Sequence, residues 1–213
     1  MKKVRRRTEA KNVIYNHVVN NIREYTIVIL IFIIGIVLGV IFVNNSNDTQ
    51  KNEISLYISN FINSLKDNAN TIDKTALLKD TIKNNVLLAL LLWFMGCTVV
   101  GVPIVYLIVA YRGFAMSYTI SSLMATLGGK GIGASIATLL LHNIIFIPAV
   151  FALAVSGIRL YKSIMKDKRK ENIKLEICRH TIFSIFFCLI LVCAAFIEVY
   201  CSTMFMQNYV KYI

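Results

Sequence analysis

The chain has 213 residues, of which 57% are hydrophobic and only 16% are charged. Soluble domains are usually about 45–50% apolar and about 25% charged, so this composition indicates a membrane protein. It excludes a disordered chain, a collagen and a secreted disulfide scaffold. The formal net charge is +12, and its meaning depends on where the basic residues lie relative to the membrane.

The first predicted elements are a basic arm, residues 1–25, and an apolar run, residues 26–43. The spacing of apolar residues in the arm favours an amphipathic cytoplasmic helix on the inner leaflet, or a helical extension of the first span. The run 26–43 contains no charge and has about the length of a crossing helix. Because it ends without a small-x-small cleavage site, we interpret it as an uncleaved signal anchor.

An extracytoplasmic loop, residues 44–85, follows the first span. Within 54–65, apolar residues recur at helical spacing on one face, namely Ile54, Tyr57, Ile58, Phe61, Ile62 and Leu65. The loop is too small to be a stable independent domain, so this face needs a cover. The cover is either the protein's own bundle or lipid, or a partner protein. Loops on rigid scaffolds often carry function, so these six residues are our candidate partner-binding residues.

Four further spans are predicted, at residues 86–111, 114–127, 132–160 and 181–206. A crossing helix needs roughly 20 apolar residues, so the segment 114–127 is either a thin span or a re-entrant hairpin. Glycine and proline inside these runs are tolerated in membrane helices. We therefore predict an all-α, polytopic membrane protein with about five transmembrane helices.

The distribution of basic residues predicts the orientation. With five spans, 16 Lys and Arg residues fall on the side of the N-terminal arm, Arg112 counted as a loop residue, and 7 fall on the other side. The positive-inside rule then places the N-terminus in the cytoplasm and the tail, residues 207–213, outside. The cytoplasmic loop, residues 161–180, is strongly basic, so anionic inner-leaflet lipids are expected partners. Nucleic acid is not, because topology and lipid already account for the charge.

Polar side chains inside the spans are the candidates for a buried site. His142 and Asn143 lie in the fourth predicted span and Glu198 lies in the fifth. Counting from the inner ends puts His142 and Glu198 at a similar height, about 25 Å above the inner interface, which allows contact. The pair is either a structural hydrogen bond that fixes helix register or part of a proton or ion relay.

Motifs of conventional catalysis are missing from the sequence. The five cysteines form no C-x-x-C pair, and no Walker, HExxH or GxSxG pattern occurs. The glycine-rich stretch 128–131 lacks the Lys-Ser/Thr ending of a phosphate loop and is better interpreted as a turn. We therefore predict no catalytic residue, no metal site and no cofactor, and a protein that is not an enzyme.

The whole chain resembles the stage II sporulation protein M family. The resemblance rests on the order and spacing of its parts: the basic arm, the signal anchor, the external loop, Asn84-Asn85, Leu141-His142-Asn143, Pro148 and Glu198. At Phe146 the chain departs from the wider family, which often has a glutamate there. That departure weakens any catalytic or transport role inferred from the family's buried acids.

The resemblance implies a membrane scaffold of the sporulation engulfment complex. Such a protein would recruit two peptidoglycan hydrolases, stage II sporulation proteins D and P, to the septal membrane of the mother cell. The residues alone leave an alternative, a small transporter or channel that uses His142 and Glu198 together with helix breaks at Pro103 and Pro148. Small residues in the spans also allow a homo-oligomer.

Overall fold

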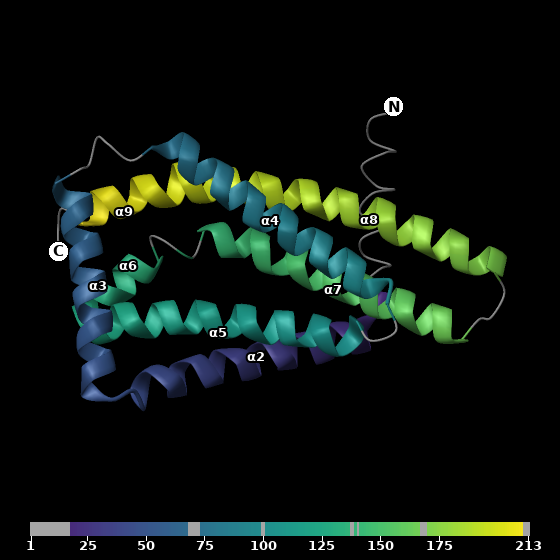
Figure 1. Ribbon diagram of the computed structural model, residues 1–213, viewed down its shortest axis with the longest axis horizontal. Helices are drawn as coiled ribbons and strands as arrows, with labels where there is room; N and C mark the ends of the chain where they lie inside the picture. The colour runs from purple at the N-terminus through teal and green to yellow at the C-terminus, as the bar shows by residue number, and fades with distance from the viewer. Residues whose placement is uncertain are drawn as a thin grey trace.

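Five long helices of the computed structural model run between the same two ends of an elongated bundle (Figure 1). The structure describes residues 18–67, 73–98, 101–136, 139, 141–166 and 170–210. Throughout this described part the regular structure is helical, which confirms the predicted all-α, polytopic fold. The five helices are α2 (Ile22–Asn44), α4 (Lys74–Gly96), α5 (Gly101–Leu127), α7 (Leu141–Lys166) and α8 (Lys170–Ile197).

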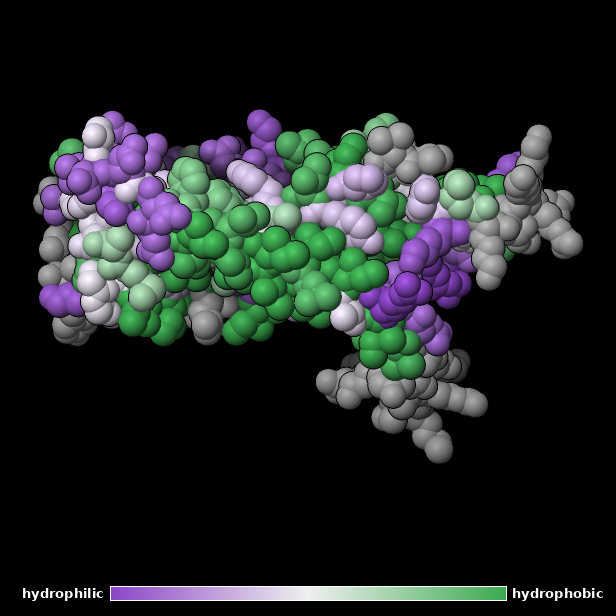
Figure 2. Space-filling view, turned by 90° about the horizontal axis from the view of Figure 1, so that it is seen from below, coloured by the Kyte–Doolittle hydropathy of each residue, from purple (hydrophilic) through white to green (hydrophobic). Residues whose placement is uncertain are grey.

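Four of these helices are long and apolar enough to cross a bilayer, namely α2, α5, α7 and α8. Helix α4 runs between the same two ends (Figure 1), but exposed Lys79, Asp80 and Lys83 interrupt its first half. On the face that Figure 2 shows, hydrophobic side chains cover the middle and hydrophilic ones gather towards the ends. This distribution fits a bundle whose middle is surrounded by lipid.

The prediction of separate spans at 86–111 and 114–127 is wrong. The chain ends α4 at Gly96, turns, and then forms one continuous helix, α5, from Gly101 to Leu127. Arg112 therefore lies within a helix rather than in a loop. With Arg112 removed, the predicted cytoplasmic count of basic residues falls from 16 to 15, still well above 7, so the predicted orientation does not depend on it.

Local chemistry explains where α4 and α5 begin. Helix α4 begins early because the Asp73 carboxylate accepts hydrogen bonds from the amides of Thr75 (2.9 Å) and Ala76 (3.1 Å), which caps its first turn. Pro103 lies in the first turn of α5, where its missing N–H would have no intrahelical partner. The turn lies between the end of α4 and this first turn of α5, within a run of residues whose apolar composition is continuous.

The remaining predicted boundaries also shift. The predicted span 132–160 merges two helices, because α6 (Gly129–Ser135) precedes α7. Gly128 connects α5 to α6 with a φ of +58°, a conformation that side chains disfavour. The predicted loop 161–180 is mostly helical, since α7 reaches Lys166 and α8 starts at Lys170.

The predicted last span, 181–206, is part of a longer helical path. Helix α8 continues through a π-helical turn, η2 (Glu198–Ser202), into α9 (Thr203–Val210). Most of the predicted arm 1–25 and the end of the predicted tail, residues 1–17 and 211–213, lie outside the described residues.

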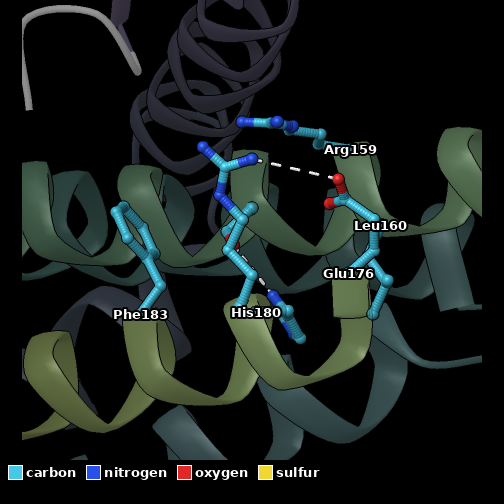
Figure 3. A pocket seen from close by; sticks show the side chains of 7 residues that line it. Arg159, Leu160, Glu176, His180 and Phe183 are labelled. Atoms are coloured by element: carbon cyan, nitrogen blue, oxygen red, sulfur yellow. Dashed lines mark hydrogen bonds and ion pairs between the residues drawn. The ribbon is translucent and has the colours of Figure 1, made fainter. Parts of the chain in front are cut away.

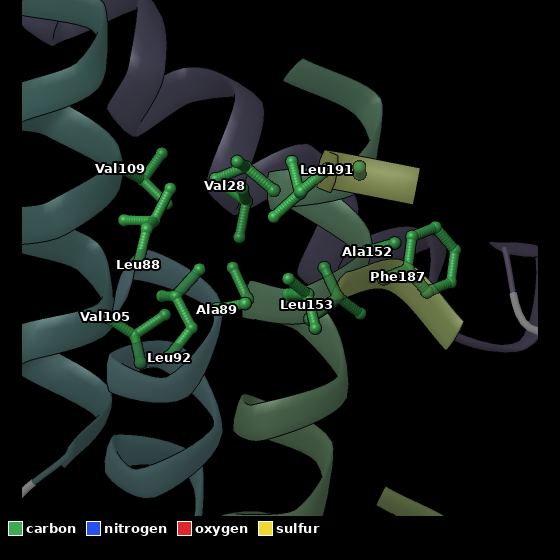
Figure 4. Close-up of a cluster of buried hydrophobic side chains, with 14 of the residues drawn as sticks. Val28, Leu88, Ala89, Leu92, Val105, Val109, Ala152, Leu153, Phe187 and Leu191 are labelled. Carbon is green, nitrogen blue, oxygen red and sulfur yellow. The ribbon is translucent and has the colours of Figure 1, made fainter. Parts of the chain in front are cut away.

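The main core joins all five long helices (Figure 4). It contains Val28 of α2, Leu88 and Leu92 of α4, Val105 and Val109 of α5, Leu153 of α7 and Leu191 of α8, all nearly or fully buried. A polar link crosses it, because the Asn85 amide donates to the Leu191 carbonyl oxygen at 3.0 Å. The bundle is therefore closely packed where it would lie in lipid.

Helix α3 (Asp48–Asp67) lies across one end of the bundle, transverse to the long helices (Figure 1). Ile58 and Ile62 form a second, smaller core with Leu123 of α5, Ala134 of α6 and Met206 of α9. At the same end, the Tyr209 hydroxyl donates to the Lys130 carbonyl oxygen at 3.1 Å and ties α9 to α6. The charge count assigns this end to the outside of the cell.

Candidate functional site

The structure brings His142 and Glu198 together. The Nδ1 atom of His142 lies 3.4 Å from Oε2 of Glu198, and the same nitrogen lies 3.2 Å from the carbonyl oxygen of Ala194. The His142 side chain is only 12% exposed, whereas that of Glu198 is 41% exposed. The π-helical turn begins at Glu198. Such turns occur frequently at functional sites.

Arg112 joins this pair, although the sequence analysis placed it in a loop. Its Cζ atom lies 5.1 Å from the centre of the Phe146 ring, and that ring lies 4.7 Å from the ring of His142. Arg112 is 11 residues from the start of α5, so it stands about 16 Å above that end, roughly half of a 30 Å hydrocarbon core. The charged group is therefore near the middle of the bilayer.

These residues line one cavity of about 190 Å³ between α2, α5, α7 and η2. Its polar lining comprises Arg112, Thr119, His142, Asn143 and Glu198, and its apolar lining includes Phe32, Met116, Phe146 and Ile147. The charges of Arg112 and Glu198, carried by different helices, attract each other. Asn143, the third predicted polar residue, thus shares the site. Ionisable residues at this depth are rare and costly, so they mark a functional site by default.

A second polar cluster, which the sequence analysis missed, lies near the other end of the bundle. His180 is 3% exposed, and its Nδ1 lies 2.8 Å from the Ser156 hydroxyl. The Trp93 indole nitrogen donates to the Thr181 hydroxyl at 3.1 Å. The sequence signal was one histidine at the edge of a predicted span, and it was absorbed into the predicted loop 161–180.

Figure 3 shows the small hollow above His180. Arg159 and Phe183 lie beside it, and the Glu176 carboxylate lies 3.9 Å from a guanidinium nitrogen of Arg179. The hollow is partly open and has a volume of about 30 Å³, enough for a water molecule. The cluster joins α4, α7 and α8, and its hollow is much smaller than the cavity at Arg112.

The six predicted partner-binding residues of α3 divide into two groups. Ile58 and Ile62 are buried against the bundle, and Ile54 packs beside them. Tyr57 and Phe61 are 75% and 47% exposed. The side chain of Leu65 lies outside the described part. The protein's own bundle thus covers part of the predicted face and leaves its aromatic edge accessible.

Candidate metal ligands are sparse in the described residues. No group of three or more His, Cys, Asp or Glu side chains converges there in a way that could hold a metal ion. The cysteines, Cys97, Cys178, Cys188, Cys193 and Cys201, are all free thiols.

The fold and cavity define a multi-pass helical membrane protein with a transverse helix at one end and a charged site at mid-depth. The family model described as SpoIIM, stage II sporulation protein M, matches residues 28–203, and the chain belongs to this family. No curated protein and no solved structure matches it. The protein is therefore a sporulation-related membrane protein, as the resemblance in its sequence predicts.

Proposed function

We propose that this protein is a membrane scaffold of the sporulation engulfment complex. It recruits peptidoglycan hydrolases, the stage II sporulation proteins D and P, and localises them at the septal membrane of the mother cell. Membership of the family supports a role in sporulation. The observation that carries the proposal is the position of α3, which is fixed across one end of the bundle and presents exposed aromatic side chains.

Two features make α3 a suitable docking element. Its buried isoleucines contact α5, α6 and α9, so its backbone is held before any partner arrives, which lowers the ordering cost of binding. Tyr57 and Phe61 are one helical turn apart and exposed, and aromatic residues are enriched among the residues that dominate binding energy. We call Tyr57 and Phe61 the aromatic edge of α3.

The mechanism is localisation rather than chemistry. An enzyme tied to a membrane anchor acts at a high effective concentration on the adjacent cell wall, without any new catalytic group. The scaffold itself is not an enzyme in this proposal. Arg159, Lys162 and Arg179 lie at the opposite end of the bundle, where they would contact anionic inner-leaflet lipids and support the orientation.

The test is affinity purification of a tagged full chain from detergent-solubilised sporulating cells, with mass spectrometry of the co-purifying proteins. We expect both hydrolases with the wild-type chain, and their loss with Tyr57→Asp or Phe61→Asp at normal abundance of the scaffold. Asn52→Asp is the matched control, because Asn52 is exposed on the opposite side of the same helix from Tyr57 and Phe61. It should recruit normally.

Two results would contradict the proposal. One is a wild-type chain that carries neither hydrolase, and the other is normal recruitment by both aromatic-edge variants. Ile58→Asp is unsuitable for this purpose, because Ile58 is buried in the small core and its replacement would displace α3 itself.

A further inference from the structure

The charged cavity poses a problem of charge compensation that the chain does not fully solve by itself. Within the described part of the chain, Arg112 makes no hydrogen bond or ion pair, and its close neighbour is the face of the Phe146 ring. A cation–π contact offsets only part of the cost of placing an arginine near the centre of a membrane. The guanidinium therefore retains unused donors that face the cavity.

Glu198 supplies the opposite charge at another point of the same cavity. Its carboxylate contacts His142 through one oxygen and is 41% exposed. Thr119, Leu139 and Glu198 line the cavity on the side of the external end, since Thr119 lies seven residues beyond Arg112 along α5. The site thus has a cationic group near mid-membrane and an anionic group nearer the outside, separated by space that side chains do not fill.

We propose that this cavity binds a small zwitterion that carries both a carboxylate and an amine. The carboxylate pairs with the Arg112 guanidinium, which presents several donors in a planar fork suited to that group. The amine pairs with the Glu198 carboxylate. Asn143 and Thr119 supply further polar contacts, and Phe32, Phe146 and Met116 enclose the carbon chain.

The arrangement of charge selects this class of ligand over simpler ones. A simple anion would pair with Arg112 but would be repelled by Glu198. A simple cation would pair with Glu198 but would be repelled by Arg112. A zwitterion compensates both groups and leaves the occupied cavity neutral, which reduces the cost of burying charge in a low-dielectric region. The volume of about 190 Å³ provides room for a molecule of amino-acid size.

The test measures the thermal unfolding of the purified full chain in detergent, followed by the fluorescence of its one tryptophan, Trp93. The probes are glycine, β-alanine, γ-aminobutyrate, 5-aminovalerate and 6-aminohexanoate, whose charges are progressively further apart. Acetate and methylammonium are the single-charge controls. We expect at least one zwitterion to raise the melting temperature in a saturable way, and neither control to do so at equal concentration.

Variants that remove a charge test whether Arg112 and Glu198 cause the rise in melting temperature. Arg112→Gln and Glu198→Gln should each weaken the best zwitterion at least tenfold. Either variant leaves one charge uncompensated and so endangers folding. The double variant removes both charges and should fold while losing the response. Arg179→Gln, which changes an exposed arginine far from the cavity, should keep the response.

The proposal would be overturned by the absence of stabilisation across the whole series. Equal stabilisation by acetate alone would also overturn it, because it would indicate a simple anion site at Arg112. A response that persists in the double variant would exclude this cavity as the binding site. The assay uses purified protein without hydrolases, so its outcome is independent of the outcome of the scaffold experiment.

Discussion

Gly39 of α2 packs directly against Ser117 of α5, so closely that a β-carbon at Gly39 would overlap the Ser117 hydroxyl. One turn earlier, a β-carbon on Gly35 would collide with the Ala110 carbonyl oxygen. Gly35 and Gly39 form a small-xxx-small pair, the pattern that lets membrane helices approach at backbone distance. The close contact between α2 and α5 therefore requires glycine, which has no side chain, at positions 35 and 39.

This contact predicts the effect of adding a methyl group. Gly39→Ala should lower the free energy of unfolding by about 1–3 kcal/mol, because the helices must separate to accept the extra carbon. Denaturant titration of the purified protein in detergent measures the change. Gly129→Ala is the matched control, since a β-carbon there would meet no atom of the described residues within 4 Å, and it should be nearly neutral. Equal stability of the two variants would disprove the close packing of α2 on α5.

The two buried serines Ser156 and Ser184 should respond differently to the same substitution. Ser156→Ala removes the hydroxyl that lies 2.8 Å from Nδ1 of buried His180, and should cost about 1–3 kcal/mol because the ring nitrogen loses its partner. The Ser184 hydroxyl has no hydrogen-bond partner among the described residues, so Ser184→Ala should be neutral or stabilising. The same denaturant titration compares them. A smaller loss at Ser156 than at Ser184 would contradict the assigned hydrogen bond.

The turn between α4 and α5 can be located by chemical labelling. In a chain whose five native cysteines are replaced, Thr98→Cys should react with a membrane-impermeant maleimide added on the cytoplasmic side. Thr98 lies in the turn, whereas Leu107 lies on the lipid-facing surface of α5, so Leu107→Cys should stay unlabelled. If a single span instead covered 86–111, Thr98→Cys would be protected.

Acid should weaken the start of α4. Hydrogen bonds from the amides of Ala76 and Thr75 hold the pKa of Asp73 below its ordinary value. A carboxyl with a lowered folded-state pKa contributes stability that is present above its unfolded pKa and is lost as pH falls through the folded pKa. Hydrogen exchange of the first turn of α4, corrected for intrinsic rates, should therefore show less protection at acidic pH than at pH 7.

Asn is the control for this pH effect because it caps helices but does not titrate. In Asp73→Asn, protection of the same amides should no longer depend on pH across the acidic range. In Asp73→Ala, protection should be low at every pH. A pH dependence that survives in Asp73→Asn would assign the effect to another group.

Much of the architecture follows from hydropathy. The run 26–43 lies within α2, and the periodic residues of 54–65 lie within α3. The turn after Gly96 was missed because a window of apolar residues records composition but not chain direction. The start of α4 was missed because Lys79, Asp80 and Lys83 make its first half polar, and a search for apolar residues does not detect a helix that continues through charged ones.

The candidate site was only half visible in the sequence. His142 and Glu198 stood out as polar residues in clearly apolar runs, and counting from the inner ends predicted that they would be able to meet because it placed them at a similar height. Arg112 was assigned to a loop, since a charge between two apolar runs usually marks the end of a span. Its true place depends on Phe146 and Glu198, which approach it from other helices. Contacts between residues on different helices, such as these around a buried charge, leave no periodic pattern in the sequence.

The exposed charges of α4 make the lipid-facing perimeter of the bundle uneven. Between Lys83 and the end of the helix, the uncharged apolar stretch runs from Val86 to Gly96, which is about 17 Å of helix. The uncharged stretch of α2 from Thr26 to Val43 is about 27 Å long. To accommodate this difference in length, the bilayer beside α4 must become thinner, or the side chains of Lys79 and Lys83 must extend to the membrane surface. The protein therefore deforms the bilayer on one flank and not on the other, and a locally thinned or curved membrane accommodates it at lower cost than a flat one.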